Sequence, residues 1–412
     1  MPLFFSYALN LIPMNISRRA FAFLFSATSL ALLSANIVLG QSSKGHAYLV
    51  FVGTYTDKTD SKGIYAFDFD ASSGKLTPRG LAVETPNPSW LVIHPNGKWA
   101  YAANESGKQS TITAFSVDAK SARLTLLNQL PALGEDPCYL SFDKSGKYLF
   151  AANYTSGNVV VFPILPDGKL GEHSSAVKDA GPLGPNKERQ EGPHAHWVRV
   201  FPGNTLLYVA DLGLDRVLFY DFNASKGTLA VHDATVGPSR PFAQNTLDLR
   251  PGTGPRHVAI ARSNSYRGYI YVLGEMDSTI TVFAPTKEGI LNPRQTLSTL
   301  PANFSGRNDA AEIALYPSGK WLFASNRGHD SIAVFAVDPS TGKLKPAGDY
   351  STGGKEPRHF AIDPTGQFLL AENQNSNSIV VFRINPESGT LSQISTTEGI
   401  PSPVCLTFLR TP

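Results

Sequence analysis

Cysteine is scarce in this chain of 412 residues, which contains only two. Cys138 and Cys405 lie in different copies of a repeat that runs through the sequence, at adjacent positions of its pattern. Neighbouring residues of a strand point to opposite faces of the sheet. We therefore expect no disulfide between the two cysteines.

Sequence signatures of common catalytic and cofactor sites are also missing. The chain has neither a glycine-rich phosphate-binding loop ending in Gly-Lys-Ser/Thr nor a Gly-x-Ser-x-Gly motif. His194 and His196 could offer two imidazoles to a metal, but nearby arginines would repel a cation and no acidic cluster completes a ligand shell. The sequence thus predicts neither a cofactor nor a metal site.

Excess charge is small as well. The formal net charge is +3, and residues 1–40 contribute Arg18 and Arg19 and no other charged residue, so the charge without them is +1 (3 minus 2). A nearly neutral chain argues against a nucleic-acid partner. The 42% of hydrophobic residues, with 35 glycines and 30 prolines, are typical of a folded globular protein.

The N-terminal segment has the pattern of an export signal. Arg18 and Arg19 precede an apolar stretch that ends in small residues near Gly40. The paired arginines resemble a twin-arginine signal, while an ordinary secretory signal or a retained anchor remain alternatives. We expect residues 1–40 to be a signal peptide, and residues 41–412 to be a periplasmic or secreted domain that is monomeric and leaves the membrane after cleavage.

The rest of the chain is built from repeats. Four segments share an apolar strand, a turn with glycine or proline, and a second apolar strand: 88–104, 137–153, 311–326 and 357–373. Two divergent copies occupy 196–211 and 255–274, and each copy is followed by a third and a fourth strand rich in β-branched and aromatic residues. Such self-similarity predicts an array of four-stranded units.

The two ends of the chain supply one further unit. Residues 48–83 provide three strands that lack a first strand, and residues 401–410 provide a strand of the missing type. Pairing of these segments closes a ring and removes its open sheet edge. The sequence therefore predicts an all-β fold, a seven-bladed β-propeller closed by N-terminal strands and a C-terminal strand in one blade.

The register of the repeat predicts which residues meet. In a propeller the first strand of each blade lines the central channel, and the start of that strand lies on the same face as the end of the antiparallel second strand. The position after the blade proline is occupied by Ser89, Cys138, His196, Arg256, Ala311, Arg358 and Val404. The residue just after the second strand is Tyr55, Glu105, Tyr154, Leu212, Glu275, Arg327 and Gln374.

Ionisable residues concentrate at these ring positions, and such a group in a concavity is the usual sign of an active site. We expect five catalytic residues: His194, His196, Arg256, Glu275 and Arg327. We expect four further residues to bind substrate: Glu105, Tyr154, His257 and Arg358.

The Pro-Arg-His sequence occurs twice, at 255–257 and 357–359. The alternative to a functional role is blade packing, with arginine paired to a carboxylate and histidine bonded to a backbone carbonyl. For His257 and His359, which are in register with Trp90, we favour the packing role. We interpret the first Pro-Arg-His copy as catalytic and the second as a structural repeat of it.

Several phrases resemble a known family. They are GTYT (53–56), NPSWLVIHPNGKWAYAANE (87–105), GPHAHW (192–197), GPRH (254–257), DSTITVF (277–283), SNRGHDSIAVF (325–335) and EPRHFAIDPTGQFLLAEN (356–373). Together they look like the seven-bladed propeller lactonases, a family that includes propeller-type 6-phosphogluconolactonase and fungal carboxymuconate cyclase. The resemblance covers nearly the whole chain after residue 45. It implies an active site at His194 or His196, Arg256, Glu275 and Arg327.

The resulting hypothesis is a metal-independent lactonase that resembles 6-phosphogluconolactonase, a carboxylic ester hydrolase acting on a small-molecule sugar lactone, an aldonolactone. A histidine would be the base for water, Arg256 and Arg327 would hold the oxyanion, and Glu275 would orient a histidine or shuttle a proton. Two alternatives remain open at this point: a propeller that binds a ligand or protein without catalysis, and a muconate-type cycloisomerase.

Overall fold

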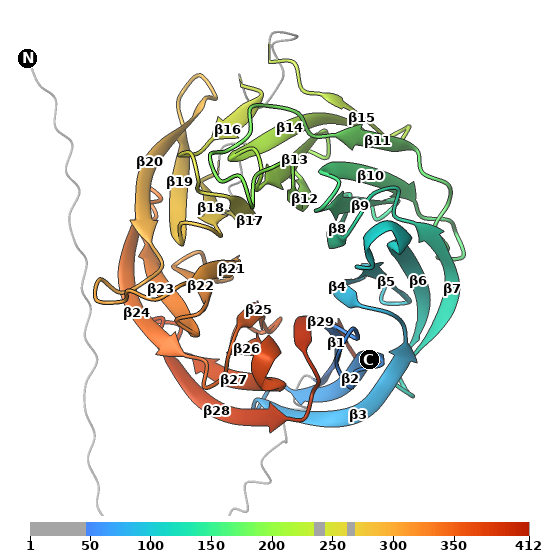
Figure 1. Ribbon diagram of the computed structural model, residues 1–412. Coiled ribbons are helices and arrows are strands. Elements are labelled where there is room, and N and C mark those ends of the chain that lie inside the picture. The colour runs from blue at the N-terminus through green and yellow to red at the C-terminus, as the bar shows by residue number, and fades with distance from the viewer. Residues whose placement is uncertain (1–46, 235–243, 262–267, 412) are drawn as a thin grey trace, which may run out of the picture. The chain divides into compact units, whose positions relative to one another are not determined.

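The computed structural model describes residues 47–234, 244–261 and 268–411. They form seven antiparallel sheets arranged around a central axis, as Figure 1 shows. The expected signal peptide, residues 1–40, lies outside the described residues. The seven-bladed propeller predicted from the repeats is confirmed.

In each sheet, the first to fourth strands follow one another from the central channel to the outside. The first strands are β29 (Pro403–Arg410), β4 (Pro88–Ile93), β8 (Pro137–Phe142), β12 (Ala195–Val200), β17 (Pro255–Ile260), β21 (Asp309–Leu315) and β25 (Pro357–Ile362). The second strands are β1 (Ala47–Thr54), β5 (Trp99–Asn104), β9 (Tyr148–Asn153), β13 (Leu206–Asp211), β18 (Ile270–Gly274), β22 (Trp321–Arg327) and β26 (Phe368–Asn373).

In the outer half of each sheet the third strand is largely buried and the fourth strand is exposed. The third strands are β2 (Gly63–Asp70), β6 (Thr111–Asp118), β10 (Asn158–Pro163), β14 (Arg216–Asn223), β19 (Thr279–Pro285), β23 (Ser331–Val337) and β27 (Ser378–Ile384). The fourth strands are β3 (Lys75–Glu84), β7 (Arg123–Pro131), β11 (Ser175–Lys178), β15 (Thr228–Val231), β20 (Leu291–Ser298), β24 (Leu344–Ser351) and β28 (Leu391–Glu398). A short extra strand, β16 (Thr246–Asp248), pairs with β14.

The ring is closed by the two ends of the chain, as expected. β29 pairs antiparallel with β1, with Leu409 opposite Leu49, and the sheet has the order β29-β1-β2-β3. Within the described segments the helices are the single 3-10 turns η1 (Gly107–Gln109) and η2 (Gln374–Ser376), so none has the length to span a bilayer.

The hydrophobic core lies between neighbouring blades. One cluster joins Trp197, Tyr208 and Phe219 of the β12–β15 sheet to Val272 and Phe283 of the next sheet. The second strands are buried along nearly their whole length because each of their faces packs against another sheet. The fourth strands instead alternate between exposed and half-buried residues, since one side faces solvent.

Asparagine at the end of the second strand fastens several blades. Asn104, Asn153, Asn326 and Asn373 each donate a side-chain hydrogen bond to a carbonyl of the loop that enters the same blade. At Gly274 an added Cβ would come within 2.5 Å of Thr253 Cγ2 and Asp277 Oδ1. This blade therefore has no room for the asparagine found in those four blades.

The first strands carry a β-bulge where the ring residues lie. The register with the second strand shifts between Pro255 and His257, and at the corresponding place in the other blades. Strict alternation, from which we expected adjacent ring positions to face opposite ways, is wrong here because a bulge inserts an extra residue. Arg256 Nη1 and His257 Nε2 consequently lie only 3.3 Å apart.

Candidate active site

One mouth of the channel gathers the starts of the first strands and the loops after the second strands. Its centre is Glu275, which directly follows β18 and is buried, with 6% of its side chain exposed. Arg256, near the start of β17, brings Nε to 3.0 Å from Glu275 Oε2. Arg327, at the end of β22 one blade further on, brings Nη2 to 3.2 Å from the same oxygen.

A third guanidinium comes from a long loop between β11 and β12. Arg189 Nη2 lies 2.5 Å from Glu275 Oε1, and its Nη1 lies 3.8 Å from Asp309 Oδ1. Arg189 was not among the site residues expected from the sequence, because this loop is not part of the repeat. The only available signal was its charged composition just before His194.

The electrostatics of this cluster fix its charge state. Burial favours the neutral form of Glu275, but Arg327 and Arg256 outweigh it and hold the pKa of the carboxyl far below its usual range. Burial and the neighbouring arginines lower the pKa of Arg256 to about 10, which leaves its guanidinium charged at neutral pH. Glu275 is therefore a carboxylate among cations.

Two of these arginine contacts are close without being well-aligned hydrogen bonds. Arg256 Nε and Arg327 Nη2 are buried and lie at ion-pair distance from Glu275, yet neither has a hydrogen-bond partner. We attribute the lack of hydrogen bonds at these short distances to N–H bonds that do not point at the carboxylate oxygen. The two groups are therefore donors that the carboxylate holds in place and that no hydrogen bond within the described residues uses.

The two histidines of the His-Ala-His sequence differ in their surroundings. His194 Nδ1 contacts the carbonyl oxygen of Tyr154 at 3.0 Å, and its ring stacks on the Tyr154 ring with centroids 4.6 Å apart. His196 meets the rings of Tyr154 and His257 edge-on, and its Nδ1 is buried without a partner. Burial, followed by Arg256 and His257, lowers the pKa of His196 well below its ordinary value.

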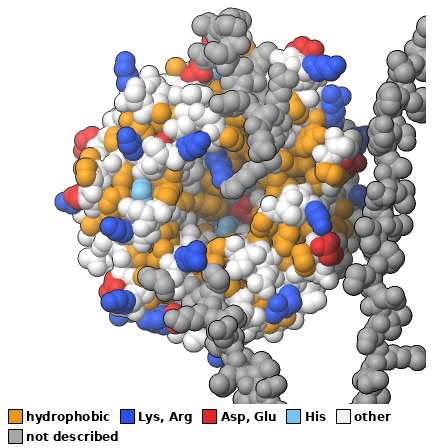
Figure 2. All heavy atoms as spheres, turned by 180° about the vertical axis from the view of Figure 1, so that it is seen from behind, with side chains coloured by type: hydrophobic (Ala, Val, Ile, Leu, Met, Phe, Trp, Pro, Cys, Tyr) orange, Lys and Arg blue, Asp and Glu red, His pale blue; other side chains and the backbone are white. Residues whose placement is uncertain are grey.

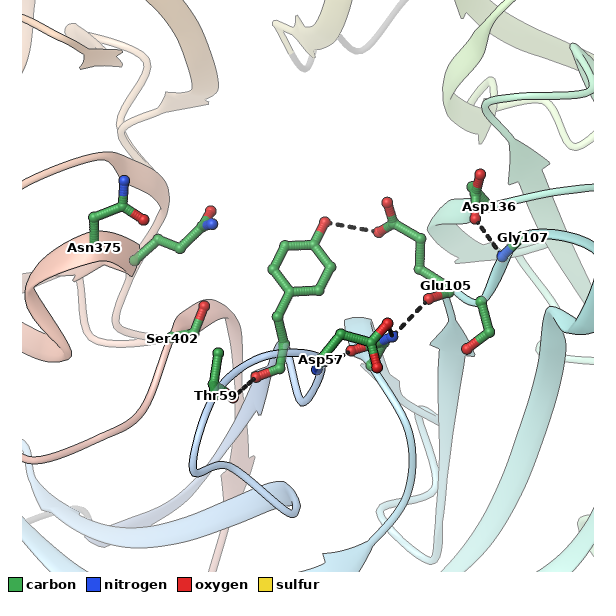
Figure 3. Close-up of a pocket in the computed structure, with 11 residues that line it drawn as sticks. Asp57, Thr59, Glu105, Gly107, Asp136, Asn375 and Ser402 are labelled. Carbon is green, nitrogen blue, oxygen red and sulfur yellow. Dashed lines mark hydrogen bonds between the residues drawn. The ribbon is translucent and has the colours of Figure 1, made fainter.

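A second group of residues adjoins the mouth. Tyr55 donates a hydrogen bond of 2.8 Å to Glu105 Oε2, and the Arg358 guanidinium carbon lies 5.3 Å from the centre of the Tyr55 ring. Tyr55 and Glu105 border a cavity of about 580 Å³ whose lining also includes Asp57 and Asp136. Figure 3 shows Asp57 and Glu105 facing this cavity from one side and Asn375 from the other. A further cavity of about 610 Å³ is lined by Arg189, Arg307 and Asp309.

His257 lies behind Arg256 and faces neither of these cavities. Its Nδ1 is 3.0 Å from Glu312 Oε2, and His359 Nδ1 is 2.6 Å from Glu372 Oε2. The packing role that we favoured for both histidines assigned them backbone carbonyl partners, which is wrong, because each is paired with a buried carboxylate. Neither Glu312 nor Glu372 was among the site residues expected from the sequence.

The opposite mouth of the channel is a separate concavity. A cavity of about 400 Å³ there is lined by Trp90, Tyr139, Glu312 and His359 among others. Figure 2, viewed from behind Figure 1, shows a central hollow with histidine and acidic side chains inside it. Cys138 and Cys405 are buried, unpaired thiols in different blades.

The structure thus brings Arg256, Glu275, Arg327 and His196 together, with His194 and Tyr154 beside them. It places Glu105 at the adjoining cavity and the Arg358 guanidinium against the ring of Tyr55. Among the described residues, no group of three or more acidic, histidine or cysteine side chains is arranged to hold a metal ion.

Comparison with known proteins points to one family. The family model described as "Lactonase, 7-bladed beta-propeller" matches residues 49–408. A Bacillus subtilis protein named 6-phosphogluconolactonase is 35% identical over 365 residues, covering 88% of this chain and 99% of its own. A Formosa agariphila protein of the same name is 34% identical, covering 76% and 85%.

A solved structure supports the same assignment. The periplasmic gluconolactonase of Pseudomonas aeruginosa has 32% sequence identity and a TM-score of 0.79, covering 89% of this chain and all of its own. The chain therefore belongs to the seven-bladed β-propeller lactonase family.

Proposed function

We propose that the protein hydrolyses the ester bond of a sugar lactone at the mouth that contains Glu275. One observation carries this proposal: Arg256 and Arg327 have buried, unbonded N–H groups, and His196, whose Nδ1 is also unbonded, packs against the His257 ring that contacts Arg256. Ester hydrolysis needs donors for an oxyanion and a base for water. Both are present within one cluster.

His196 is the base in this proposal. Its lowered pKa keeps the imidazole neutral at neutral pH, the form that accepts a proton. Its ring packs edge-on against His257, whose Nε2 lies 3.3 Å from Arg256 Nη1, so His196 adjoins the cluster. His194 is held by the Tyr154 carbonyl and the stacked Tyr154 ring, which suits it to a supporting role.

The reaction then proceeds in two steps. His196 removes a proton from water while the water oxygen bonds to the lactone carbonyl carbon, and the carbonyl electrons move onto its oxygen, where Arg256 and Arg327 donate hydrogen bonds. Collapse of this intermediate breaks the ring C–O bond, and the imidazolium gives its proton to the departing alkoxide. The carboxylic acid product ionises and releases one proton.

Glu275 has a holding role in this scheme. Both carboxylate oxygens are engaged by guanidinium groups, so we propose orientation of the arginines as its role and not the proton shuttle that we also considered. Its oxygens lie within 3.2 Å of atoms of three guanidinium groups. Such preorganisation lets the arginines meet developing charge without first moving.

The adjoining cavity favours an uncharged sugar over a phosphorylated one. Asp57, Glu105 and Asp136 line it, together with the amides of Asn87 and Asn375. Carboxylates and amides accept hydrogen bonds from hydroxyl groups, whereas carboxylates repel a phosphate. We therefore propose a free aldonolactone as substrate, like that named for the Pseudomonas protein, and export of the mature domain, for which the twin-arginine pattern is the support.

A pH-stat assay on free and 6-phosphorylated gluconolactone tests the proposal, with the spontaneous rate subtracted. We expect faster proton release on the free lactone, and losses in kcat of at least about a hundredfold in His196→Ala and Arg256→Ala. His173→Ala, which removes an exposed histidine, is the matched control. Arg256→Lys serves if the alanine variant does not fold.

Full activity in both alanine variants would refute the assigned roles. No turnover on any lactone by a folded protein would instead favour a binding propeller. Loss of the ultraviolet absorbance of a conjugated diene would indicate a cycloisomerase.

A further inference from the structure

Four buried ionisable side chains form a continuous row behind Arg256. They are His257 of β17, Glu312 of β21, His359 of β25 and Glu372 of β26. Glu312 Oε2 lies 3.0 Å from His257 Nδ1 and 3.6 Å from His359 Nε2, and Glu372 Oε2 lies 2.6 Å from His359 Nδ1. The row crosses three blades, and the reaction proposed above does not use it.

The proton positions follow from the partners at the Arg256 end. Arginine can only donate, so His257 Nε2, 3.3 Å from Arg256 Nη1, must accept. The remaining proton of a neutral His257 is then on Nδ1 and is donated to Glu312 Oε2. Burial and Arg256 lower the pKa of His257 well below its ordinary value, in agreement with a neutral ring.

Glu312 carries the negative charge of the row. Its Oε2 accepts from His257, and its Oε1 accepts from the backbone N–H of Ile313 at 2.9 Å. Burial raises the pKa of Glu312, while His359 and Arg256 oppose that rise. With a donor on each oxygen, the carboxylate is the form that this site satisfies.

Glu372, at the other end, is a neutral acid. The backbone N–H of Leu406 approaches His359 Nδ1 at 3.4 Å, so this nitrogen accepts, and the Glu372 hydroxyl must donate to it. Glu372 Oε1 has no partner, which a carbonyl oxygen tolerates better than a carboxylate does. Burial and Glu312 raise the pKa of Glu372 well above its usual value.

We propose that Glu312 is a positioning residue for lactone hydrolysis, acting through His257 on the guanidinium of Arg256. This inference rests on the function proposed above. The Glu312 carboxylate holds His257 in the tautomer that accepts from Arg256 Nη1, which also donates to the carbonyl of Ala311. These two acceptors hold the guanidinium with its Nε 3.0 Å from Glu275 Oε2 and without a hydrogen-bond partner, as the donor assigned to the oxyanion.

Substitution by glutamine should have different effects at Glu312 and at Glu372, the two carboxyl groups of the row. In Glu312→Gln an amide N–H must face either the His257 Nδ1–H or the Ile313 N–H. The first arrangement forces the other His257 tautomer, whose Nε2–H then opposes the Arg256 donor. In Glu372→Gln an amide N–H replaces the acid O–H as donor to His359, so the row is preserved.

Steady-state kinetics on gluconolactone test this difference. We expect Glu312→Gln to lower kcat by about tenfold to a hundredfold, as a misplaced catalytic group does, with KM changed less than about twofold. For Glu372→Gln we expect both constants within about twofold of wild type. Equal losses in the two variants, or an unchanged kcat in Glu312→Gln, would overturn the proposal.

A second measurement does not depend on turnover. Nitrogen-15 chemical shifts of labelled histidine, with His257 assigned by its loss in His257→Asn, report the ring tautomer. We expect Nδ1–H in the wild type and in Glu372→Gln, and a change to Nε2–H in Glu312→Gln. Wild-type His257 with its proton on Nε2 would refute the positioning role, whether or not the lactone assay succeeds.

Discussion

Replacing Glu275 by glutamine isolates the role of the negative charge that contacts all three guanidinium groups. The substitution keeps the size of the side chain and removes its charge. Breaking a buried ion pair by neutralising one partner costs about 3–5 kcal/mol, because the other charge stays buried without compensation. Arg256 and Arg327 are the partners left in that state, with 4% and 12% of their side chains exposed.

The size of the effect can be expressed as a shift in Tm. An unfolding entropy of about 2.1 cal/mol/K per residue gives about 0.8 kcal/mol/K for a domain of this length. A loss of about 3–5 kcal/mol then lowers Tm by roughly 4–6 °C. We expect kcat on gluconolactone to fall as well, by about a hundredfold, because the two oxyanion donors lose their anchor.

The dependence on pH has a defined sign. The pKa of Glu275 is lowered in the folded state, so its stabilising contribution is present above the unfolded pKa of about 4.3 and is lost as pH falls toward the folded value. The difference in Tm between wild type and Glu275→Gln should therefore be full at pH 7 and smaller at pH 3.

Thermal unfolding followed by circular dichroism measures these shifts. Glu84→Gln is the matched control, since Glu84 pairs with Lys62 at 3.9 Å and both side chains are at least 66% exposed. We expect that control to change stability by less than about 1 kcal/mol. If Glu275→Gln were as stable as Glu84→Gln, the argument that the carboxylate holds the arginines would be wrong.

Three further outcomes are expected. Because the pKa of Glu372 is raised in the folded state, its contribution to folding stability is full below the unfolded pKa and is lost as pH rises. The Tm of Glu372→Gln should therefore rise relative to that of the wild type between pH 4 and pH 8. A difference in Tm that stays constant over this range would contradict the prediction. Glu105→Gln should raise KM for free gluconolactone about fivefold, the effect of one lost hydrogen bond of about 1 kcal/mol. It should also increase the rate on the phosphorylated lactone relative to the free lactone. An unchanged ratio of these rates would exclude the proposed repulsion between Glu105 and the phosphate. Replacing Arg18 and Arg19 by lysines should retain the protein in the cytoplasm if the twin-arginine route is used, as measured by immunoblotting of cell fractions, whereas normal export would point to the general secretory route.

The repeat made the fold predictable from the sequence. Each copy combines strands of period two with a turn containing glycine or proline, and the unpaired segments at 48–83 and 401–410 complement one another. Strand direction also predicted that residues after the second strands would meet residues at the starts of the first strands. Glu275 and Arg256, separated by one hairpin, meet in this way.

The details that escaped prediction depend on local backbone geometry and on tertiary contacts. The bulge between Pro255 and His257 has no sequence signature of its own, so alternation assigned Arg256 and His257 to opposite faces. Arg189 reaches Glu275 from a loop outside the repeat. The partners of His257 and His359 come from other strands, and periodicity does not report which polar side chain lies opposite.

Closure of the ring by β29 and β1 has a consequence for how the chain folds. The partners Leu49 and Leu409 are separated by nearly the full length of the domain, and β29 follows the other described strands in the chain. During synthesis the inner edge of β1, the second strand of the first blade, therefore remains unpaired until every other blade has been made. Contacts of such long range form slowly, and an unpaired edge can recruit strands from other chains. Loss of β29 should thus be more harmful than its eight residues suggest, by converting a closed ring into an open template for aggregation.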